Sequence, residues 1–249
     1  MTDLVHEDHA AIVTGAAGVL GLATSRALLD RGATVIMVDI DQDRLERLAA
    51  ELGEKAIPAT IDLRDPDEIG ATAQRLLDEV GAVDILVNNA GILSNNKSAT
   101  TTPEEWRNVL AVNLDAALYL SQAVLPGMRE RRWGRIVNTC SLAGKNGGLT
   151  AGTAYSVSKG ALAALTFSLA REVAGDGVTA NGIAPAYVRT PMVMEQLNEA
   201  QRQAVLDQIP VGRFCEAEEF AHVVTFLTHP LAGFITGEVV DLNGGLLFD

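Results

Sequence analysis

A phenol and an ammonium stand one helical turn apart in the segment 155–159, where Tyr155 precedes Lys159 by four residues. On a helix these two side chains share one face. Free tyrosine titrates near ~10, and lowering its pKa to ~7 requires about 4 kcal/mol of differential stabilisation. A close cation can supply much of that stabilisation. We therefore expect Tyr155 to exchange a proton with the oxygen of an alcohol or a ketone.

Two other polar residues stand where catalytic groups are expected. Ser141 follows the strand-like run 135–138, and in a parallel sheet the active groups gather at the carboxyl ends of strands. A serine there can donate a hydrogen bond to the substrate oxygen, although a strand-end serine is more often a turn former. Asn113 lies within a helical pattern, where asparagine is unfavourable. We expect its side chain to hold a water that links Lys159 to solvent.

A glycine-rich turn follows the first strand-like run, with the sequence Thr-Gly-Ala-Ala-Gly-Val-Leu-Gly at positions 14–21. Glycines in a strand-to-helix turn let the backbone approach a pyrophosphate, and the helix N-terminus offers free N–H groups and positive potential. The spacing differs from G-x-G-x-x-G, and tight turns need glycine whatever they bind. The turn alone therefore leaves a purely structural role open.

Asp39 ends the second strand-like run. A carboxylate at this place can accept hydrogen bonds from both ribose hydroxyls of an adenosine, and it repels a 2′-phosphate. An exposed strand-end aspartate or a helix cap is the alternative interpretation. Together with the glycine turn, Asp39 predicts that the cofactor is NAD rather than NADP.

Short apolar runs alternate with longer helical patterns along the whole chain. We expect strands at 10–13, 34–38, 56–61, 84–87, 135–138, 178–183 and 239–242, and helices at 19–30, 41–52, from 65 onward, 102–130 and 154–173. Apolar strands that are each followed by a helix imply a parallel sheet covered on both faces. The expected fold is α/β, a single Rossmann-type doubly wound domain over residues 1–249 with a seven-stranded parallel sheet. A substrate lid is expected at about 191–215.

The overall composition narrows the classes of partner. The 249 residues carry a net charge of −13, so we expect neither nucleic acid nor a membrane as a partner. Cys140 and Cys215 show no CxxC spacing, and the four histidines show no metal-ligand spacing. We therefore expect no disulfide framework and no metal site. Because the N-terminus lacks a signal-peptide pattern, we expect a cytoplasmic location.

Together these residues resemble the short-chain dehydrogenase/reductase family, in the family's order and over essentially the whole chain. Similar motifs are the glycine turn, N-N-A-G at 88–91, the catalytic set Ser141, Tyr155 and Lys159 with Asn113, and N-G-G at 243–245. The resemblance implies that the cofactor is bound by Gly15, Gly18, Val19, Leu20, Gly21, Asp39, Asp62, Leu63, Asn89, Ala90, Gly91, Tyr155, Lys159, Pro185, Val188 and Thr190. It also implies a homotetramer built on the helices at 103–130 and 154–174 and on the C-terminal strand region.

Three positions depart from the family's usual pattern. The family's turn usually reads T-G-x-x-x-G-x-G, but here Gly18 precedes the place of the second glycine and Val19 occupies it. Ala186 replaces a usual glycine, so its backbone must avoid positive φ. Cys140 stands where a serine is frequent, and we interpret it as a buried structural thiol.

The residues that would face the small-molecule substrate allow two classes of compound. Loops 93–97 and 145–149 contain Lys97 and Lys145, which favours a polar or anionic substrate unless both lysines are solvated loop residues. Met192, Val193, Met194 and Leu197 could instead wall an apolar pocket for an acyl or cyclic ketone. We predict an NAD-dependent oxidoreductase of a polar secondary alcohol, sugar or hydroxy acid. The alternatives are a 3-oxoacyl-thioester reductase and, in another class, a non-catalytic dinucleotide-binding sensor.

Overall fold

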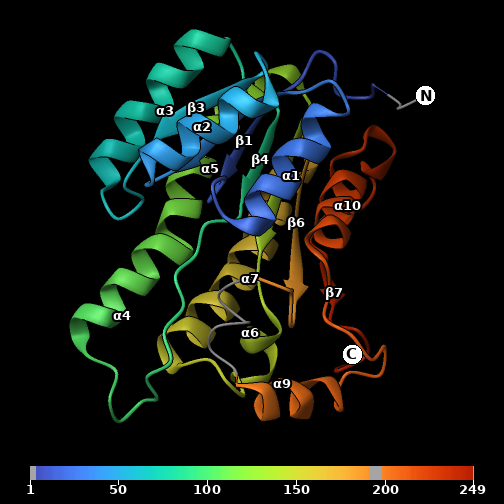
Figure 1. Ribbon diagram of the computed structural model, residues 1–249. Helices are drawn as coiled ribbons and strands as arrows, with labels where there is room; N and C mark the ends of the chain where they lie inside the picture. The colour runs from blue at the N-terminus through green and yellow to red at the C-terminus, as the bar shows by residue number, and fades with distance from the viewer. Residues whose placement is uncertain (1–3, 191–197, 249) are drawn as a thin grey trace.

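The computed structural model of the chain, which describes residues 4–190 and 198–248, is built around a parallel β-sheet (Figure 1). Within the described residues the strands are β1 (Ala10–Thr14), β2 (Thr34–Asp39), β3 (Ala56–Thr60), β4 (Ile85–Asn88), β5 (Gly134–Thr139), β6 (Val178–Pro185) and β7 (Val239–Leu242). They form one seven-stranded sheet in the order β3-β2-β1-β4-β5-β6-β7, and every pair is parallel. The predicted α/β fold with a seven-stranded parallel sheet is confirmed.

Helices cover both faces of this sheet. They are α1 (Val19–Leu29), α2 (Gln42–Leu52), α3 (Pro66–Val80), α4 (Pro103–Leu110), α5 (Ala116–Arg131), α6 (Leu142–Asn146), α7 (Thr153–Val173), α9 (Glu199–Leu206) and α10 (Ala217–Thr228). On one face α1 and α10 pack Leu28 and Phe220 into the core, and on the other α5 and α7 pack Leu120 and Leu169. The strands β1, β5 and β6 are buried along their whole length, as a sheet covered on both faces requires.

Two helices begin at the capping residues that precede them in the sequence. The Asp41 carboxylate accepts the N–H of Arg44 at the start of α2. Asp65 accepts the N–H groups of the two residues after Pro66 at the start of α3. These bonds satisfy N–H groups that the first helical turn leaves without partners, and proline suits that turn because it has no N–H. The caps therefore fix where the chain leaves the sheet edge near β2 and β3.

The predicted helix at 102–130 is divided by a wider turn. α4 ends at Leu110, a π-helical turn spans Ala111–Asp115, and α5 continues from Ala116. Such turns carry an extra residue and frequently occur at functional sites. This one holds Asn113, which is buried. The apolar spacing is helical on both sides of this turn, so the sequence pattern predicted one unbroken helix.

One helical stretch of the described residues, Pro103–Arg131, is long and apolar enough to cross a membrane. Its residues Leu120, Val124 and Met128 instead join the hydrophobic core beside the sheet. A core helix meets the same criteria of length and composition, so the stretch is weak support for a membrane span.

The segment predicted as a lid, 191–215, is described only in part, because residues 191–197 lie outside the described residues. The remainder contains α9, which begins with a capping box between Asn198 and Gln201. Val205, Ile209 and Phe214 then form a small apolar cluster. Both the lid and the single-domain organisation stay predictions.

Candidate active site

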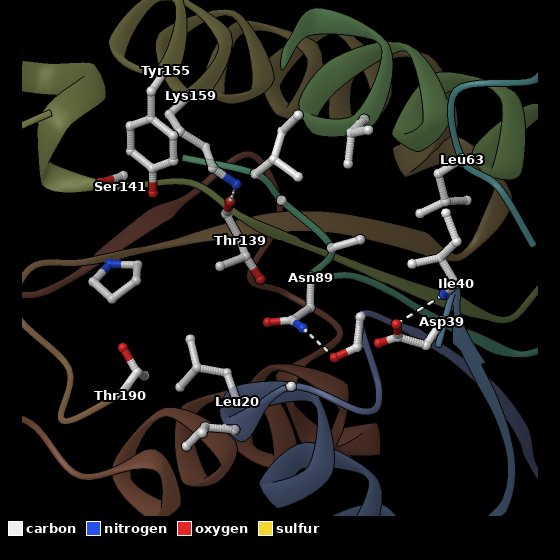
Figure 2. A pocket seen from close by; sticks show the side chains of 18 of the residues that line it. Leu20, Asp39, Ile40, Leu63, Asn89, Thr139, Ser141, Tyr155, Lys159 and Thr190 are labelled. Atoms are coloured by element: carbon white, nitrogen blue, oxygen red, sulfur yellow. Dashed lines mark hydrogen bonds between the residues drawn. The ribbon is translucent and has the colours of Figure 1, made fainter. Parts of the chain in front are cut away.

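A cavity of about 650 Å³ opens at the carboxyl ends of the strands (Figure 2). It lies beside β1 and β4, where the strand order reverses, which is the place where open α/β sheets bind ligands. The predicted site residues that line it are Gly15, Gly18, Val19, Leu20, Asp39, Leu63, Asn89, Ala90, Gly91, Ser141, Tyr155, Lys159, Pro185, Val188 and Thr190. The predicted residues Gly21, Asp62 and Asn113 are not among those that line it.

The glycine turn closes tightly. Gly15 has a φ of +66°, and a Cβ there would lie 3.0 Å from the Cα of Ala90. A Cβ on Gly21 would lie 2.1 Å from the carbonyl oxygen of Gly15, so only glycine fits. α1 begins at Val19, with Gly18 as its N-cap. Val19 therefore occupies the first helical position, where a side chain needs no positive φ, and the turn forms without a glycine at 19.

The cavity wall fits a dinucleotide. Gly18, Val19 and Leu20 line it, which places the N-terminus of α1 and its positive potential where a phosphate would lie. Farther along, Ile40 and Leu63 supply apolar surface suited to an aromatic base.

Asp39 stands at the end of β2 with its carboxylate held by backbone N–H groups. Oδ2 accepts from Ala17 at 2.9 Å, and Oδ1 accepts from Ile40 at 2.8 Å and from Asp41 at 3.2 Å. These hydrogen bonds fix a negative charge beside the glycine turn, where Figure 2 shows it at the cavity edge.

Asp62 forms an ion pair with its neighbour Arg64. The guanidinium donates to both carboxylate oxygens, with distances between 2.6 Å and 3.1 Å. The pKa of the Asp62 carboxyl is held below its usual range by these hydrogen bonds. Arg64 rather than Asp62 lines the cavity, so the sequence analysis missed Arg64 as a wall residue.

Thr14 and Asn89 join β1 to the end of β4. The hydroxyl of Thr14 accepts the backbone N–H groups of Asn89 and Ala90, each at 2.9 Å. The Asn89 carboxamide donates to the Thr14 carbonyl at 2.9 Å. These bonds hold the two strand ends together. This part of the cavity wall therefore needs no bound ligand to keep its shape.

Ser141, Tyr155 and Lys159 meet at the end of the cavity away from Asp39 (Figure 2). Ser141 is the N-cap of α6, a helix that the sequence analysis did not predict, and its hydroxyl is hydrogen-bonded to that of Tyr155. Lys159 Nζ donates to the carbonyl of Thr139 at 2.7 Å and lies 5.8 Å from the centre of the Tyr155 ring. The predicted helical spacing thus brings the phenol and the ammonium to the same end of the cavity.

Burial dominates the titration of Tyr155 and Lys159. It raises the pKa of the Tyr155 phenol, and the hydrogen bond from Ser141 opposes this only in part. It lowers the pKa of Lys159 to about 8, which leaves the ammonium mostly charged at neutral pH. Burial of the phenol thus opposes the lowering of the Tyr155 pKa that the spacing predicts, and the lowering stays a prediction for the site with an oxidised nicotinamide bound.

Asn113 ties two segments of the site together. Its Oδ1 accepts the N–H of Ile92 at 2.8 Å, and its Nδ2 donates to the Ile92 carbonyl at 3.1 Å and to Ser158 Oγ at 3.0 Å. Both N–H groups of the carboxamide thus have protein partners. These contacts hold the segment after β4 against α7, and the expected role of Asn113 in holding a water stays a prediction.

The end of β6 closes the cavity, and the Ala186 backbone there donates to the Leu242 carbonyl at 3.1 Å. Among the described non-glycine residues, positive φ occurs at Arg132, so alanine is accommodated at 186 without strain. The described residues contain no group of three or more potential metal ligands.

Comparisons with known proteins agree with this geometry. A family model described as short chain dehydrogenase matches residues 9–201. The chain belongs to the short-chain dehydrogenase family. It is therefore an oxidoreductase that acts on CH–OH and keto groups and uses a nicotinamide cofactor, which confirms the predicted family and enzyme class.

Several members of the short-chain dehydrogenase family are similar over nearly the full chain. The 3-oxoacyl-acyl-carrier-protein reductase FabG of Vibrio harveyi is 40% identical over 241 residues, which are 96% of this chain and 98% of that protein. FabG of Escherichia coli strain K12 is 37% identical over 242 residues, with the same coverage of 96% and 98%. A crystal structure from Brucella melitensis, described as a glucose/ribitol dehydrogenase, is 30% identical with a TM-score of 0.92, covering 99% of this chain and 100% of that one.

In this short-chain dehydrogenase a smaller hollow of about 110 Å³ adjoins Ser141 and Tyr155. Apolar side chains, among them Leu93, Leu142 and Leu149, form much of its wall. The hollow lies where a substrate must bring its carbonyl or alcohol carbon to the two hydroxyls.

The two lysines that were expected to attract an anionic substrate are engaged with the protein. Lys97 donates to the carbonyls of Gly148 and Ala151, and Lys145 forms an ion pair with Asp241 at 2.8 Å. Neither lysine lines the hollow beside the two hydroxyls. Lys145 does line a separate cavity together with Ser141 and Lys159, so a polar or anionic substrate stays a prediction.

The short-chain dehydrogenase site also contains residues that the sequence analysis missed. They are Ile40, Arg44, Ile61, Arg64, Ile92, Asn108, Val112, Thr139, Cys140 and Ala186. Ile40, Arg64 and Ile92 each follow a predicted site residue, and that adjacency could have indicated them. Thr139 accepts the hydrogen bond of Lys159 with its main-chain carbonyl. Because every residue has such a carbonyl, the residue type could not have indicated this role.

Proposed function

We propose that the protein interconverts 3-oxoacyl and 3-hydroxyacyl thioesters, with NAD(H) as the hydride carrier. The apolar hollow beside Ser141 and Tyr155 is the observation that carries this choice, because it suits the hydrocarbon of an acyl chain next to a reacting carbonyl. The relatives at 37–40% identity that are described as 3-oxoacyl-acyl-carrier-protein reductases support the same class of substrate.

The reaction needs a hydrogen-bond donor and a proton donor at one substrate oxygen, and the paired hydroxyls of Ser141 and Tyr155 meet that need. A bound nicotinamide supplies the hydride and, when oxidised, a positive charge. As hydride reaches the carbonyl carbon in reduction, Ser141 stabilises the negative charge on the oxygen and Tyr155 neutralises it by giving its proton. In oxidation, Tyr155 takes the proton of the alcohol as hydride leaves the same carbon.

Lys159 contributes a fixed positive charge to this proton transfer. Its ammonium is anchored by the Thr139 carbonyl and lies near the Tyr155 ring, so it stabilises the phenolate that remains after Tyr155 has given its proton. Asn113 keeps the Gly91–Ile92 backbone against α7, where a Cβ on Gly91 would lie 3.3 Å from Lys159 Nζ. We assign Ser141, Tyr155 and Lys159 to the chemistry and Asn113 to their placement.

Asp39 supports NAD rather than NADP. Its carboxylate is held in place by the Ala17 N–H and faces the cavity beside Ile40, where the ribose of an adenosine would lie. A fixed negative charge there accepts hydrogen bonds from ribose hydroxyls and repels a 2′-phosphate. Arg64, a cation at the same end, is already paired with Asp62.

Exposed apolar side chains support the proposed homotetramer. Val157 and Phe167 on α7, Phe226 on α10, and Phe234 and Phe248 near the C-terminus are all exposed in the single chain. Val157 and Phe167 lie on the helix 154–174, where the family resemblance places subunit contacts, and burial of these side chains between subunits would stabilise an assembly. Both cysteines are free thiols, which supports a reducing compartment such as the cytoplasm.

A dehydrogenase of a polar secondary alcohol or sugar is the second candidate, favoured by the similar structure described as a glucose/ribitol dehydrogenase. Two assays distinguish the two candidate functions, and both follow reduced nicotinamide by absorbance. One combines 3-oxoacyl-CoA thioesters with NADH or NADPH, and the other combines sugars or polyols with NAD or NADP. We expect turnover of the thioesters with NADH. Turnover of polyols alone would replace the first proposal by the second, and a preference for NADPH would overturn the argument from Asp39.

A further inference from the structure

The loop 147–152 joins α6, which Ser141 caps, to α7, which carries Tyr155. Its residues 148–151 line the small hollow beside those two hydroxyls. Gly148 has a φ of +76°, and a Cβ there would lie 2.3 Å from Ser156 Oγ, so the path of the loop is tightly specified. Leu149 is 69% exposed and forms an apolar part of the wall. The position of the loop therefore sets the shape of the hollow.

Lys97 holds both sides of this loop. Its Nζ donates to the Gly148 carbonyl at 2.9 Å and to the Ala151 carbonyl at 2.6 Å. Leu149 and Thr150 lie between these two carbonyls in the chain, so one ammonium closes the loop around them. Hydrogen bonds from a charged donor are about twice as strong as those between neutral groups.

Lys97 is itself fixed in place. Its carbonyl accepts the N–H groups of Thr100 at 2.8 Å and Thr101 at 3.0 Å, and also the hydroxyls of both threonines at 3.1 Å. The backbone from which the ammonium extends is therefore ordered before it reaches the loop. A donor on an ordered backbone loses less conformational entropy when it forms its two hydrogen bonds than a donor on a flexible segment would lose.

The start of α7 is held by a separate set of contacts. The Ser94 carbonyl accepts the Gly152 N–H at 2.6 Å, and the Asn96 carbonyl accepts the Thr153 N–H at 2.9 Å. Glu105 on α4 in turn accepts hydrogen bonds from the side chains of Ser94 and Asn96. The helix that carries the catalytic tyrosine thus keeps its anchors when the Lys97 ammonium is removed.

We propose that Lys97 is a positioning residue that sets the fit of the substrate chain by fixing the loop 147–152 as one wall of the hollow. The identity of that chain as an acyl group rests on the proposed function, whereas the effect on the loop does not. Without the ammonium, the carbonyls of Gly148 and Ala151 lose their shared donor and the loop gains conformational freedom. Because Tyr155 keeps its own anchors, the change affects binding of the chain more than the chemical step.

Lys97→Met removes the ammonium and keeps an aliphatic side chain. We expect it to raise the KM for a 3-oxoacyl thioester about tenfold, equivalent to about 1.4 kcal/mol, with kcat within about twofold of wild type. The KM for the nicotinamide cofactor stays unchanged. Lys97→Arg retains a cation with several donors and recovers most of the loss.

Lys55→Met is the matched control, because Lys55 Nζ also donates to a main-chain carbonyl, that of Gly32 at 2.8 Å, but lines neither the cavity nor the hollow. Its kinetics should match wild type. A Lys97→Met enzyme that loses kcat and cofactor affinity together, or that keeps the wild-type KM, overturns the proposal.

Hydrogen–deuterium exchange separates this proposal from the proposed function, since it needs no substrate. Peptides that cover 147–153 should exchange faster in Lys97→Met than in wild type or Lys55→Met, and unchanged exchange overturns the proposal. If wild type turns over only another alcohol or ketone, the proposed function fails. The KM and kcat of Lys97→Met are then measured with that compound, and an unchanged KM overturns the role of Lys97 as well.

Discussion

Lys159 Nζ lies 5.8 Å from the centre of the Tyr155 ring and gives its 2.7 Å hydrogen bond to the carbonyl of Thr139. The ammonium is thus anchored at the end of β5. It interacts with the phenol electrostatically. Because burial raises the pKa of Tyr155, the phenol is protonated at neutral pH in the protein alone. That state suits reduction, in which the phenol donates a proton, whereas oxidation needs a further positive charge in the cavity.

Tyr155→Phe should lower kcat/KM by roughly 10²–10⁴, the usual contribution of a positioned proton donor. Binding of NADH, measured by fluorescence titration, should stay within about twofold because the ring is retained. Tyr119→Phe is the control, since Tyr119 lies on α5 and outside the cavity wall. Activity of Tyr155→Phe near that of Tyr119→Phe would remove Tyr155 from the mechanism.

Asp39→Asn should weaken the discrimination between NAD and NADP by about tenfold or more, about 1.4 kcal/mol, because a neutral carboxamide no longer repels a 2′-phosphate. The measurement is the ratio of kcat/KM for the two cofactors. Asp41→Asn removes a charge from an exposed residue two positions farther along, which caps α2, and should leave the ratio unchanged. Equal ratios in both variants would show that the charge of Asp39 does not select the cofactor.

Gly21→Ala should weaken cofactor binding at least about tenfold and lower the melting temperature, because its Cβ would lie 2.1 Å from the Gly15 carbonyl oxygen and force the turn open. Gly70→Ala in the middle of α3 is the matched control, since a Cβ there meets nothing within 4 Å. Alanine at that place should stabilise the protein by about 0.5–1 kcal/mol. Calorimetry and NADH titration of both variants test the pair, and a Gly21→Ala protein that binds NADH normally would contradict the tight turn.

His6 should make the protein sensitive to acid. Its Nδ1 lies 3.3 Å from His9 Nδ1 and its Nε2 3.3 Å from the hydroxyl of Thr228. Burial, and then the charge of His9, lower the pKa of His6 to about 4. As pH falls from ~6.5 toward ~4, the unfolded chain binds a proton that the folded protein does not, so the free energy of unfolding decreases by up to about 3 kcal/mol.

Urea unfolding between pH 4.5 and pH 7 measures this effect of His6. His6→Gln should flatten the dependence of the free energy of unfolding on pH, because the titrating group is gone. His222→Gln, at an exposed place on α10, should keep the wild-type slope. A His6→Gln protein with the wild-type slope would assign the acid sensitivity to other groups.

The features that the sequence predicted are those carried by side-chain type and local spacing. Apolar runs gave the strands, Asp41 and Asp65 marked helix starts, and the spacing of Tyr155 and Lys159 placed both at one end of the cavity. Each depends on residues close together in the chain, for which the geometry of a helix or a strand is known in advance.

The features that the sequence could not predict depend on partners far along the chain or on burial. Lys97 contacts carbonyls more than fifty residues away, so its charge was assigned to the substrate. Thr139 acts through a backbone carbonyl, which every residue has. The direction of the Tyr155 pKa depends on how much water the folded cavity excludes, which spacing does not show.

The wider turn at Ala111–Asp115 also bears on how the chain length can vary. Because a π-turn absorbs a single extra residue locally, helical structure continues on either side of it. From within this turn the Asn113 carboxamide reaches Ile92 and Ser158. The number of residues in the stretch Pro103–Arg131 therefore determines whether this carboxamide can hold the segment after β4 against α7.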